Sequence, residues 1–210
     1  MSVSIIWDWN GTLLNDREIC LKGVNSLLLA RGIPQLTMER YLQIFTFPVK
    51  EYYSRAGFDF AREPFEVPAE QFMQLYREML PSVGLFGDVV TTLSHFRQKG
   101  YRQFILSAME QGILRECVEK RNLIHFFDGI FGIEDNFANS KLTAAKSMLR
   151  VSGLNPDRAL MIGDTLHDLE AGQVIGVKVL LVARGHQSPE RLRINGNLVF
   201  PDLVSLRSQV

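Results

Sequence analysis

The stretch SIIWDWNGTLLND, residues 4–16, contains the transition that decides the fold of this chain. Residues 3–7 are almost uninterruptedly apolar, and the run stops abruptly at Asp8. A strand that is apolar without alternation is typical of a parallel sheet buried between two helical layers. On such sheets, ligands bind at the carboxyl ends of the strands. Asp8, and Asn10 just after it, are therefore candidates for a functional site.

Length, composition and charge exclude several classes of protein. The chain has 210 residues, enough for a buried core, and its 23 Lys and Arg balance 23 Asp and Glu. This balance provides no basic field for nucleic acid, and no uncharged run of about 18 apolar residues predicts a membrane helix. Cys20 and Cys117 are too few for a disulfide framework. We expect a cytoplasmic protein with a small-molecule partner, and neither nucleic acid nor membrane; no pattern indicates its oligomeric state.

Short apolar runs like the first one recur along the chain and alternate with helical patterns. The later runs are 104–106, 130–131, 159–162 and 179–182, and the helical patterns are 88–99, 110–121 and 142–151. Strand and helix alternating in this way predict an α/β fold with a doubly wound parallel sheet. Helix and strand fragments follow Arg184, with a helix start at residues 188–190.

The segment 16–82 interrupts this alternation, because it shows helical periodicity and no convincing strand. Capping and breaking residues predict helices over 19–31, 37–45, 48–57 and 68–80. We therefore predict an inserted α-helical cap at 16–82, and an α/β core made of 1–15 and 83–210. The many aromatic residues of the insert are more typical of a small helical core than of a ligand cage.

Distant segments place further polar residues at predicted strand ends. Ser107 ends the strand in FILSA, Lys141 precedes a helix in NSKLT, and Asp164 and Asp168 follow the strand in LMIGDTLHDLEAG. A calcium loop starting at Asp8 is excluded, because the sixth position is leucine and the twelfth is isoleucine, where glycine and glutamate are needed. The four segments are expected to meet at one edge of the sheet.

These segments, in this order, resemble the four motifs of the haloacid dehalogenase-like hydrolase superfamily. The matching stretches are DWNGT, LSA, SK and GDTLHD, and the insert after the first is similar to a C1-type cap. Within the superfamily the layout looks like the branch of phosphoglycolate phosphatase and beta-phosphoglucomutase. The resemblance implies a phosphohydrolase that removes phosphate from a small phosphorylated metabolite. It also implies a magnesium ion as cofactor.

The resemblance assigns roles to single residues. Asp8 would be the nucleophile that becomes an aspartyl-phosphate, and Mg²⁺ would be held by Asp8, the backbone carbonyl of Asn10 and Asp164. Asp168 would support this metal site from outside, and Lys141 would hold nucleophile and phosphate by its charge. Lys141 is preferred to Lys146, which is one turn further on. The remaining assignment is binding of phosphoryl oxygens by the Ser107 hydroxyl and the amides of Gly11, Thr12 and Ala108.

Asn10 departs from the family pattern, since most of its phosphatases have an aspartate there that protonates the leaving group. An amide cannot transfer that proton, and such help is typically worth about 10²–10⁴-fold. One interpretation is a phosphatase weakened by Asn10. A second resembles the phosphonoacetaldehyde hydrolases, with the cap residue Lys50 as the imine-forming lysine. A third is a non-catalytic protein that binds a phosphorylated ligand or signals.

Other polar residues have weaker indications. His167 lies between two motif aspartates, and we expect it beside the metal site or exposed, because Mg²⁺ prefers oxygen. Arg184 follows a predicted strand, and a solvated turn is favoured over contact with an anionic substrate. Arg40, Lys50 and Arg55 are the cap cations considered for substrate recognition.

Overall fold

The apolar run at the N-terminus is the inner strand of a six-stranded parallel sheet, in a computed structural model that describes residues 3–134 and 141–210. The strand order is β3-β2-β1-β4-β5-β6. The strands are β1 (Ser4–Trp7), β2 (Arg102–Glu110), β3 (Gly129–Ile133), β4 (Ala159–Gly163), β5 (Lys178–Val182) and β6 (Val199–Phe200). The prediction of a doubly wound parallel α/β fold is confirmed. The order reverses at β1, so the carboxyl ends of β1, β2 and β4 form a topological switch point.

Helices cover both faces of the sheet because successive side chains of a strand point to opposite faces. Ile5 and Trp7 belong to one apolar cluster and Ile6 to another. The first cluster includes residues of α5 (Val89–Gln98), α6 (Gln111–Lys120) and α10 (Leu203–Arg207). The second includes residues of α7 (Lys141–Ser152) and α8 (Leu166–Val174). The continuous apolar pattern of β1 is therefore explained by burial on both faces.

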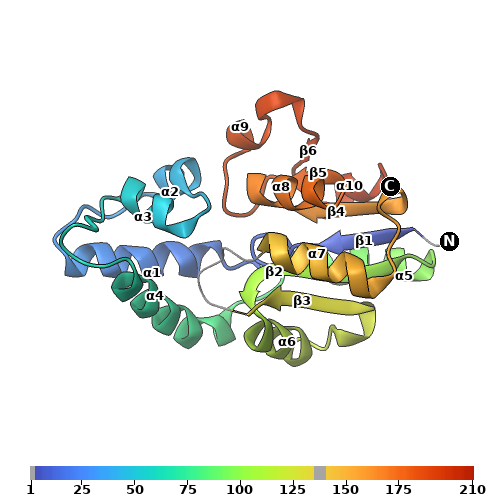
Figure 1. The fold of residues 1–210 in the computed structure, drawn as a ribbon, viewed down its shortest axis with the longest axis horizontal. Coiled ribbons are helices and arrows are strands. Elements are labelled where there is room, and N and C mark those ends of the chain that lie inside the picture. The colour runs from blue at the N-terminus through green and yellow to red at the C-terminus, as the bar shows by residue number, and fades with distance from the viewer. Residues whose placement is uncertain (1–2, 135–140) are drawn as a thin grey trace.

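The segment between β1 and α5, called the cap below (residues 16–82), is helical in the described structure. It contains α1 (Arg17–Ala30), α2 (Met38–Ile44), α3 (Val49–Ala56), α4 (Glu66–Met79) and the 3-10 helix η1 (Leu80–Ser82). As its sequence indicates, Thr37 caps α2, because its hydroxyl accepts a hydrogen bond from the amide of Arg40. Helix α4 begins two residues before Pro68, which lies in its first turn. Figure 1 shows the four helices beyond one end of the sheet, with both chain termini at the opposite side of the molecule.

The cap has an apolar core of its own. Val24 and Leu28 of α1 pack with Tyr41 of α2 and with Tyr52 and Tyr53 of α3. The aromatic rings contact one another directly; Tyr53 stacks on Phe58 with ring centroids 4.8 Å apart. Most aromatic residues of the insert thus form a small helical core, as their number in the sequence indicates.

The loop after β5 joins the core to the cap. The amide of Ser188 donates to the carbonyl of Leu42, and the side chains of Gln187 and Arg191 donate to the carbonyl of Phe45. Ser188 then caps α9 (Pro189–Leu192), as predicted. Three further 3-10 helices are η2 (Ile124–Phe126), η3 (Pro156–Arg158) and η4 (Ile194–Gly196). The segment that makes these contacts with the cap, residues 183–193 with α9 included, is called the β5–α9 loop below.

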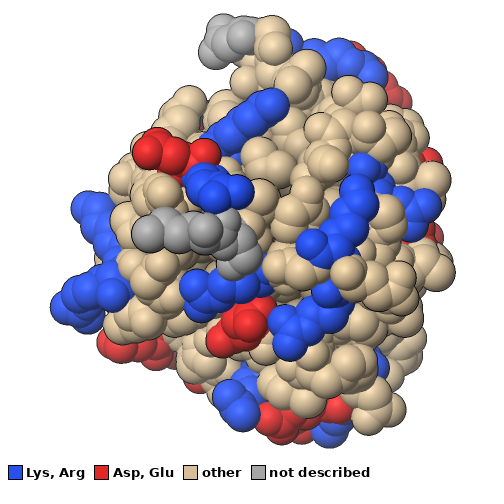
Figure 2. Space-filling model, turned by 90° about the vertical axis from the view of Figure 1, so that its right-hand side faces the viewer, with Lys and Arg blue, Asp and Glu red and all other residues tan. Residues whose placement is uncertain are grey.

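Charged side chains of both signs occur on the molecular surface. Figure 2 views the molecule from the side that carries the chain termini, and both basic and acidic side chains occur there among uncharged surface. In the described parts of the chain, none of the helices has the length and apolar character needed to cross a lipid bilayer.

Candidate active site

Two carboxylates meet because β1 and β4 are neighbours in register. Trp7 lies beside Ile162, and the amide of Asp8 continues the ladder by donating to the carbonyl of Ile162 at 2.8 Å. Asp8 and Asp164 therefore leave adjacent strands at the same edge of the sheet. Carboxylate oxygens of Asp8, Asp164 and Asp168 all lie within 4.8 Å of one another. The three side chains are buried.

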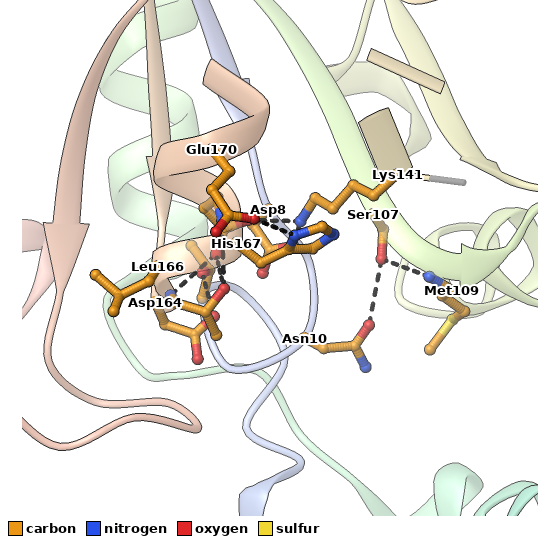
Figure 3. Close-up of polar contacts among 12 residues, drawn as sticks. Asp8, Asn10, Ser107, Met109, Lys141, Asp164, Leu166, His167 and Glu170 are labelled. Carbon is orange, nitrogen blue, oxygen red and sulfur yellow. Dashed lines mark hydrogen bonds and ion pairs between the residues drawn. The ribbon is translucent and has the colours of Figure 1, made fainter. Parts of the chain in front are cut away.

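Lys141, the first residue of α7, places its ammonium group between two of these carboxylates. Its Nζ lies 2.5 Å from an oxygen of Asp8 and 2.5 Å from an oxygen of Asp168. Figure 3 shows its side chain extending toward Asp8. The other oxygen of Asp168 accepts hydrogen bonds from the amide and hydroxyl of Thr165, the N-cap of α8. Both oxygens of Asp168 thus have protein partners, which suits a residue that positions Lys141. Lys146, the alternative, is exposed.

Asp164 is held by two different segments. One oxygen accepts from the hydroxyl of Thr12 at 3.2 Å, and the other from the amide of His186 at 2.6 Å. A Cβ on Gly11 or Gly185 would overlap the Asp164 carboxylate. Gly11 also has a φ of +73°, which favours glycine. The two glycines therefore let the backbone approach this carboxylate closely.

The side chain of Asn10 is fixed by three partners. Its amide nitrogen donates to Asp16 at 2.7 Å and to the hydroxyl of Tyr76 at 2.8 Å, and its oxygen accepts from Ser107 at 3.3 Å. The Ser107 hydroxyl also accepts from the amide of Met109, and Figure 3 shows Ser107 between these two residues. Ser107 lies where β2 shifts register against β3, between Leu106 and Glu110. The side-chain amide of Asn10 is thus held in a hydrogen-bond network. Unlike a carboxylic acid, it has no proton that it could transfer to a leaving group.

Asp16 and His186 are central to this network, and the sequence interpretation assigned neither of them a role. Asp16 accepts from the amide of Gly11 at 3.0 Å and lies 3.2 Å from Nε2 of His186. Nδ1 of His186 lies 2.7 Å from the hydroxyl of Tyr41. An aspartate before a helix indicates an N-cap. Its side chain makes no cap hydrogen bond to α1, however, and its oxygens bind these partners and Tyr76.

Burial changes the pKa values of the carboxylates in different directions. It raises the pKa of Asp8 well above the usual value, and the nearby charge of Asp168 raises it further. Burial also raises the pKa of Asp164 to about 6, with a contribution from Asp168. For Asp168, burial is outweighed by Lys141 and Thr165, so its pKa is lowered. The pKa of Lys141 is raised, because Asp168 and Asp8 outweigh its burial. The single positive charge of Lys141 therefore does not balance the negative charges of all three aspartates.

The Asp16 and His186 pair carries opposite shifts. Burial disfavours both charges, but each stabilises the other. The pKa of Asp16 is lowered by His186 and by hydrogen bonds from Asn10 and Tyr76. The pKa of His186 is raised to about 9, because the charge and hydrogen bond of Asp16 outweigh its burial.

A cavity of about 180 Å³ lies between this edge of the sheet and the cap. Its core wall carries the polar groups, including Asp8, Asn10, Lys141, Asp164 and His186. Its cap wall is mostly aromatic and apolar. The cap residues that line it are Asp16, Cys20, Tyr41, Phe45, Phe47, Val49, Tyr52, Tyr53, Phe65, Ala69, Phe72, Met73 and Tyr76. Of the expected phosphate-binding residues, Ala108 lines the cavity, whereas Gly11, Thr12 and Ser107 are packed behind its wall.

The cap cations lie away from the cavity, which corrects the expectation for Lys50. Lys50 is exposed, and its Nζ lies 5.6 Å from the centre of the Phe60 ring. It is absent from the described lining of the cavity, so it is not placed to form an imine there. Arg55 is exposed and pairs with Glu51, and Arg40 is exposed. Helix α3 turns Lys50 and Arg55 outward because its buried and partly buried residues, Val49, Tyr52 and Tyr53, occupy its inner face.

Arg184 is not in a solvated turn. Its guanidinium donates two hydrogen bonds to Asp88, at 2.6 and 2.8 Å, and one to the carbonyl of Thr12 at 2.6 Å. It also lies over the ring of Phe86. Its two terminal nitrogens are thus directed to the protein, and it supports the loop after β1. His167 is partly buried; it stacks on Phe47 with centroids 4.5 Å apart and contacts Glu170.

The fold is shared with known proteins. Residues 5–182 match the family described as haloacid dehalogenase-like hydrolase, and the chain belongs to this family. A 5'-nucleotidase of Pseudomonas aeruginosa is 27% identical and covers 97% of this chain and 93% of its own length. A phosphoglycolate phosphatase of Aliivibrio fischeri is 26% identical, covering 96% and 91%. The structure of a predicted phosphatase from Clostridium acetobutylicum superposes with a TM-score of 0.84 at 19% identity, covering 100% and 98%.

These matches confirm the predicted superfamily, its phosphoglycolate phosphatase-like branch and the prediction of a phosphatase-type hydrolase. They do not distinguish among substrates, since relatives of similar identity have names that refer to different phosphate compounds.

Proposed function

We propose that this protein is a magnesium-dependent phosphohydrolase that removes phosphate from a small phosphorylated metabolite, with Asp8 as the nucleophile. The observation that carries the proposal is the contact of Lys141 with both Asp8 and Asp168 beside Asp164, in the wall of the cavity that lies between the sheet and the cap. A carboxylate oriented by an ammonium at the end of a strand suits attack on phosphorus. The phosphatase relatives support the same reaction class.

The donor set fits Mg²⁺. The ion prefers oxygen ligands and is commonly held by one or two carboxylates together with substrate phosphate. Asp8, Asp164 and the backbone carbonyl of Asn10 would hold it. Burial, together with the nearby charge of Asp168, raises the pKa of Asp164, so a cation bound there would stabilise its charged form. Bound there, the ion would neutralise negative charge on the phosphoryl oxygens. Asp168 would act from outside, through Lys141.

The chain's own groups would orient the phosphoryl group. Lys141 holds Asp8 in one position and provides positive charge for a phosphoryl oxygen. The amide of Ala108, which lines the cavity, is proposed as a further donor. Of the other predicted donors, the amide of Gly11 already donates to the carbonyl of Leu14 and to Asp16, and Thr12 lies behind the cavity wall. The predicted contact of the Ser107 hydroxyl with a phosphoryl oxygen would require this buried group to leave Asn10, which it contacts at 3.3 Å, a distance that is long for an O–H···O hydrogen bond.

Substitution of the nucleophile tests the proposal. We expect Asp8→Asn to lower kcat on any substrate by on the order of 10⁶-fold, the loss found when a hydrolase loses its nucleophile. The measurement is phosphate release from a panel of phosphorylated metabolites, with Mg²⁺ and with a chelator. Asp157→Asn makes the same chemical change at an exposed carboxylate far from the site, and is expected to retain activity.

The opposite results are equally clear. Turnover retained by folded, purified Asp8→Asn would remove the covalent mechanism. Turnover unaffected by the chelator would remove the magnesium ion. If the wild-type protein releases no phosphate from any compound, the third interpretation, binding without turnover, takes its place.

A further inference from the structure

The cavity and Asn10 together restrict the leaving group of the proposed reaction. We propose that the substrate is an aryl phosphate, the phosphate ester of an aromatic hydroxyl, whose ring occupies the cavity under the cap. This inference rests on the proposed function and adds the substrate class. It draws on two independent features, the chemistry of the cap wall and the amide at position 10.

The first feature is the aromatic cap wall. Phe45 and Phe47 of the α2–α3 connection, and Phe72 and Met73 of α4, line this part of the cavity. An apolar cavity of roughly 150 Å³ is large enough to hold benzene, and this one is about 180 Å³. A flat ring would exchange water for contact with rings and a thioether, both of which favour aromatic partners.

The lining of the cavity as a whole disfavours a leaving group that already carries a negative charge of its own in the substrate. In the described lining, the cations are Lys141 and His186, and both face carboxylates of the core or of Asp16. Glu110 adds another negative charge to the lining. Burying the carboxylate of a group such as glycolate without a partner is costly. Lys50, which could have supplied the partner, lies outside.

The second feature concerns the bond that breaks. Attack by a carboxylate oxygen of Asp8 forms a bond to phosphorus, and the bond from phosphorus to the leaving oxygen breaks with its electron pair on that oxygen. Asn10 is held by Asp16, Tyr76 and Ser107, and it has no proton to give. The leaving oxygen therefore departs as an anion and takes a proton from water afterwards. Water then attacks phosphorus, and the bond between phosphorus and the Asp8 oxygen breaks with its electron pair on the carboxylate. Both protons of the water leave with the phosphate, and the Asp8 carboxylate is restored.

The acidity of the leaving group decides how much this matters. A phenolic hydroxyl has a pKa of about 10, so its anion is a tolerable leaving group. The pKa of an aliphatic hydroxyl is closer to that of water, which is about 15.7. Departure of an aliphatic alkoxide therefore gains far more from an acid catalyst than departure of a phenolate does. An aromatic leaving group thus satisfies both the cap wall and the missing proton donor.

Four substrates separate the two features. Phenyl phosphate has the ring and the acidic leaving group, and benzyl phosphate has the ring alone. Acetyl phosphate has the acidic leaving group alone, and phosphoglycolate has neither. With Mg²⁺, we expect kcat/KM to be highest for phenyl phosphate, about 10²-fold or more above benzyl phosphate, since that is the scale of acid catalysis. We also expect a lower KM for phenyl than for acetyl phosphate, and the slowest reaction with phosphoglycolate.

Two variants sharpen the result. Asn10→Asp is expected to speed benzyl phosphate by about 10²-fold and phenyl phosphate by much less, because only the alkyl oxygen needs the proton. Phe47→Ala is expected to lower the ratio of phenyl to acetyl phosphate kcat/KM about tenfold. Phe60→Ala makes the same change in the cap outside the cavity, and is expected to leave this ratio unchanged. Turnover of acetyl phosphate by each sample reports that the enzyme is folded.

Each contrary result would overturn one named part of the proposal. Benzyl phosphate as fast as phenyl phosphate overturns the argument from the leaving group, and an unchanged ratio in Phe47→Ala overturns the ring site. If phosphoglycolate is the best substrate, the substrate class is wrong while the proposed phosphatase function stands. If none of the four compounds is hydrolysed while the metabolite panel releases phosphate, the substrate class is wrong; if the panel releases none either, the proposed function itself fails.

Discussion

The two walls of the cavity are built from different chemistry. The core wall places Asp8, Asp164, Asp168 and Lys141 in a buried charged cluster, and each position follows from the end of a strand or the start of a helix. The cap wall is an aromatic surface formed by helices around their own apolar core. The comparison teaches that the reacting groups are held by charge and hydrogen bonds, and that the space for the rest of the substrate is shaped by packing.

The largest effect is expected where a charge is removed from the core wall. Lys141→Met keeps the length of the side chain but leaves the Asp8 and Asp168 carboxylates facing each other without their ammonium. Breaking a buried ion pair from one side costs about 3–5 kcal/mol. We expect the free energy of unfolding to fall by that amount at neutral pH in the absence of Mg²⁺, as measured by urea denaturation. Lys146→Met, on the exposed face of the same helix, is the control and is expected to change it by less than about 0.5 kcal/mol.

Equal free energies of unfolding for Lys141→Met and Lys146→Met would contradict the contrast between the two walls, because the stability of the core wall would then not depend on its charges. The measurement can be repeated with Mg²⁺. A smaller loss in Lys141→Met would show that a divalent ion compensates the same carboxylates.

A smaller effect is expected where the backbone approaches Asp164. The Cβ of Gly185→Ala would overlap its carboxylate, so the side chain must move. We expect Mg²⁺ affinity, measured by calorimetry, to fall by about 10–100-fold, as when groups that orient a metal ligand are lost. Gly87→Ala introduces a methyl group into open space and is expected to leave the affinity unchanged. Unaltered Mg²⁺ binding by Gly185→Ala would mean that Asp164 does not hold the ion.

The smallest effect is expected at the contact between the walls. The hydroxyl of Tyr41 in the cap lies 2.7 Å from Nδ1 of His186, whereas the buried hydroxyl of Tyr52 has no described partner. Tyr41→Phe leaves a buried ring nitrogen without a partner and is expected to cost about 1–2 kcal/mol in thermal or urea unfolding. Tyr52→Phe is expected to be neutral or slightly stabilising. The reverse order would show that packing, not hydrogen bonding, joins the cap to the core.

The sequence predicted the core wall better than the cap wall, for a physical reason. The carboxyl ends of parallel strands must lie at one edge of a sheet, so short apolar runs ending in Asp8 and Asp164 were enough to bring these residues together. Lys141 followed from its place before a helix. Strand β6 escaped prediction, because two partly exposed residues form no distinctive pattern.

Contacts between segments far apart in the sequence were not predictable in the same way. Asp16 has the pattern of a helix cap, and only the fold shows that its carboxylate binds Asn10 and the amide of Gly11. His186 and Arg184 follow a strand, as a turn would, yet both reach back to the first loop. Lys50 was misplaced because its direction depends on the rotation of α3, which the apolar residues of that helix determine.

The β5–α9 loop has a consequence for how such enzymes can be recombined. The amide of His186 holds Asp164, and within a few residues Gln187, Ser188 and Arg191 hold the carbonyls of α2 and the residue after it. The cap is therefore not a module bounded by its own two junctions. In a chimera that exchanged residues 16–82 alone, the β5–α9 loop of the recipient would face the α2 helix of a different cap, for which its contacts are not matched. Residues 183–193, a hundred positions downstream of the insert, must therefore be exchanged together with the cap to transfer its specificity.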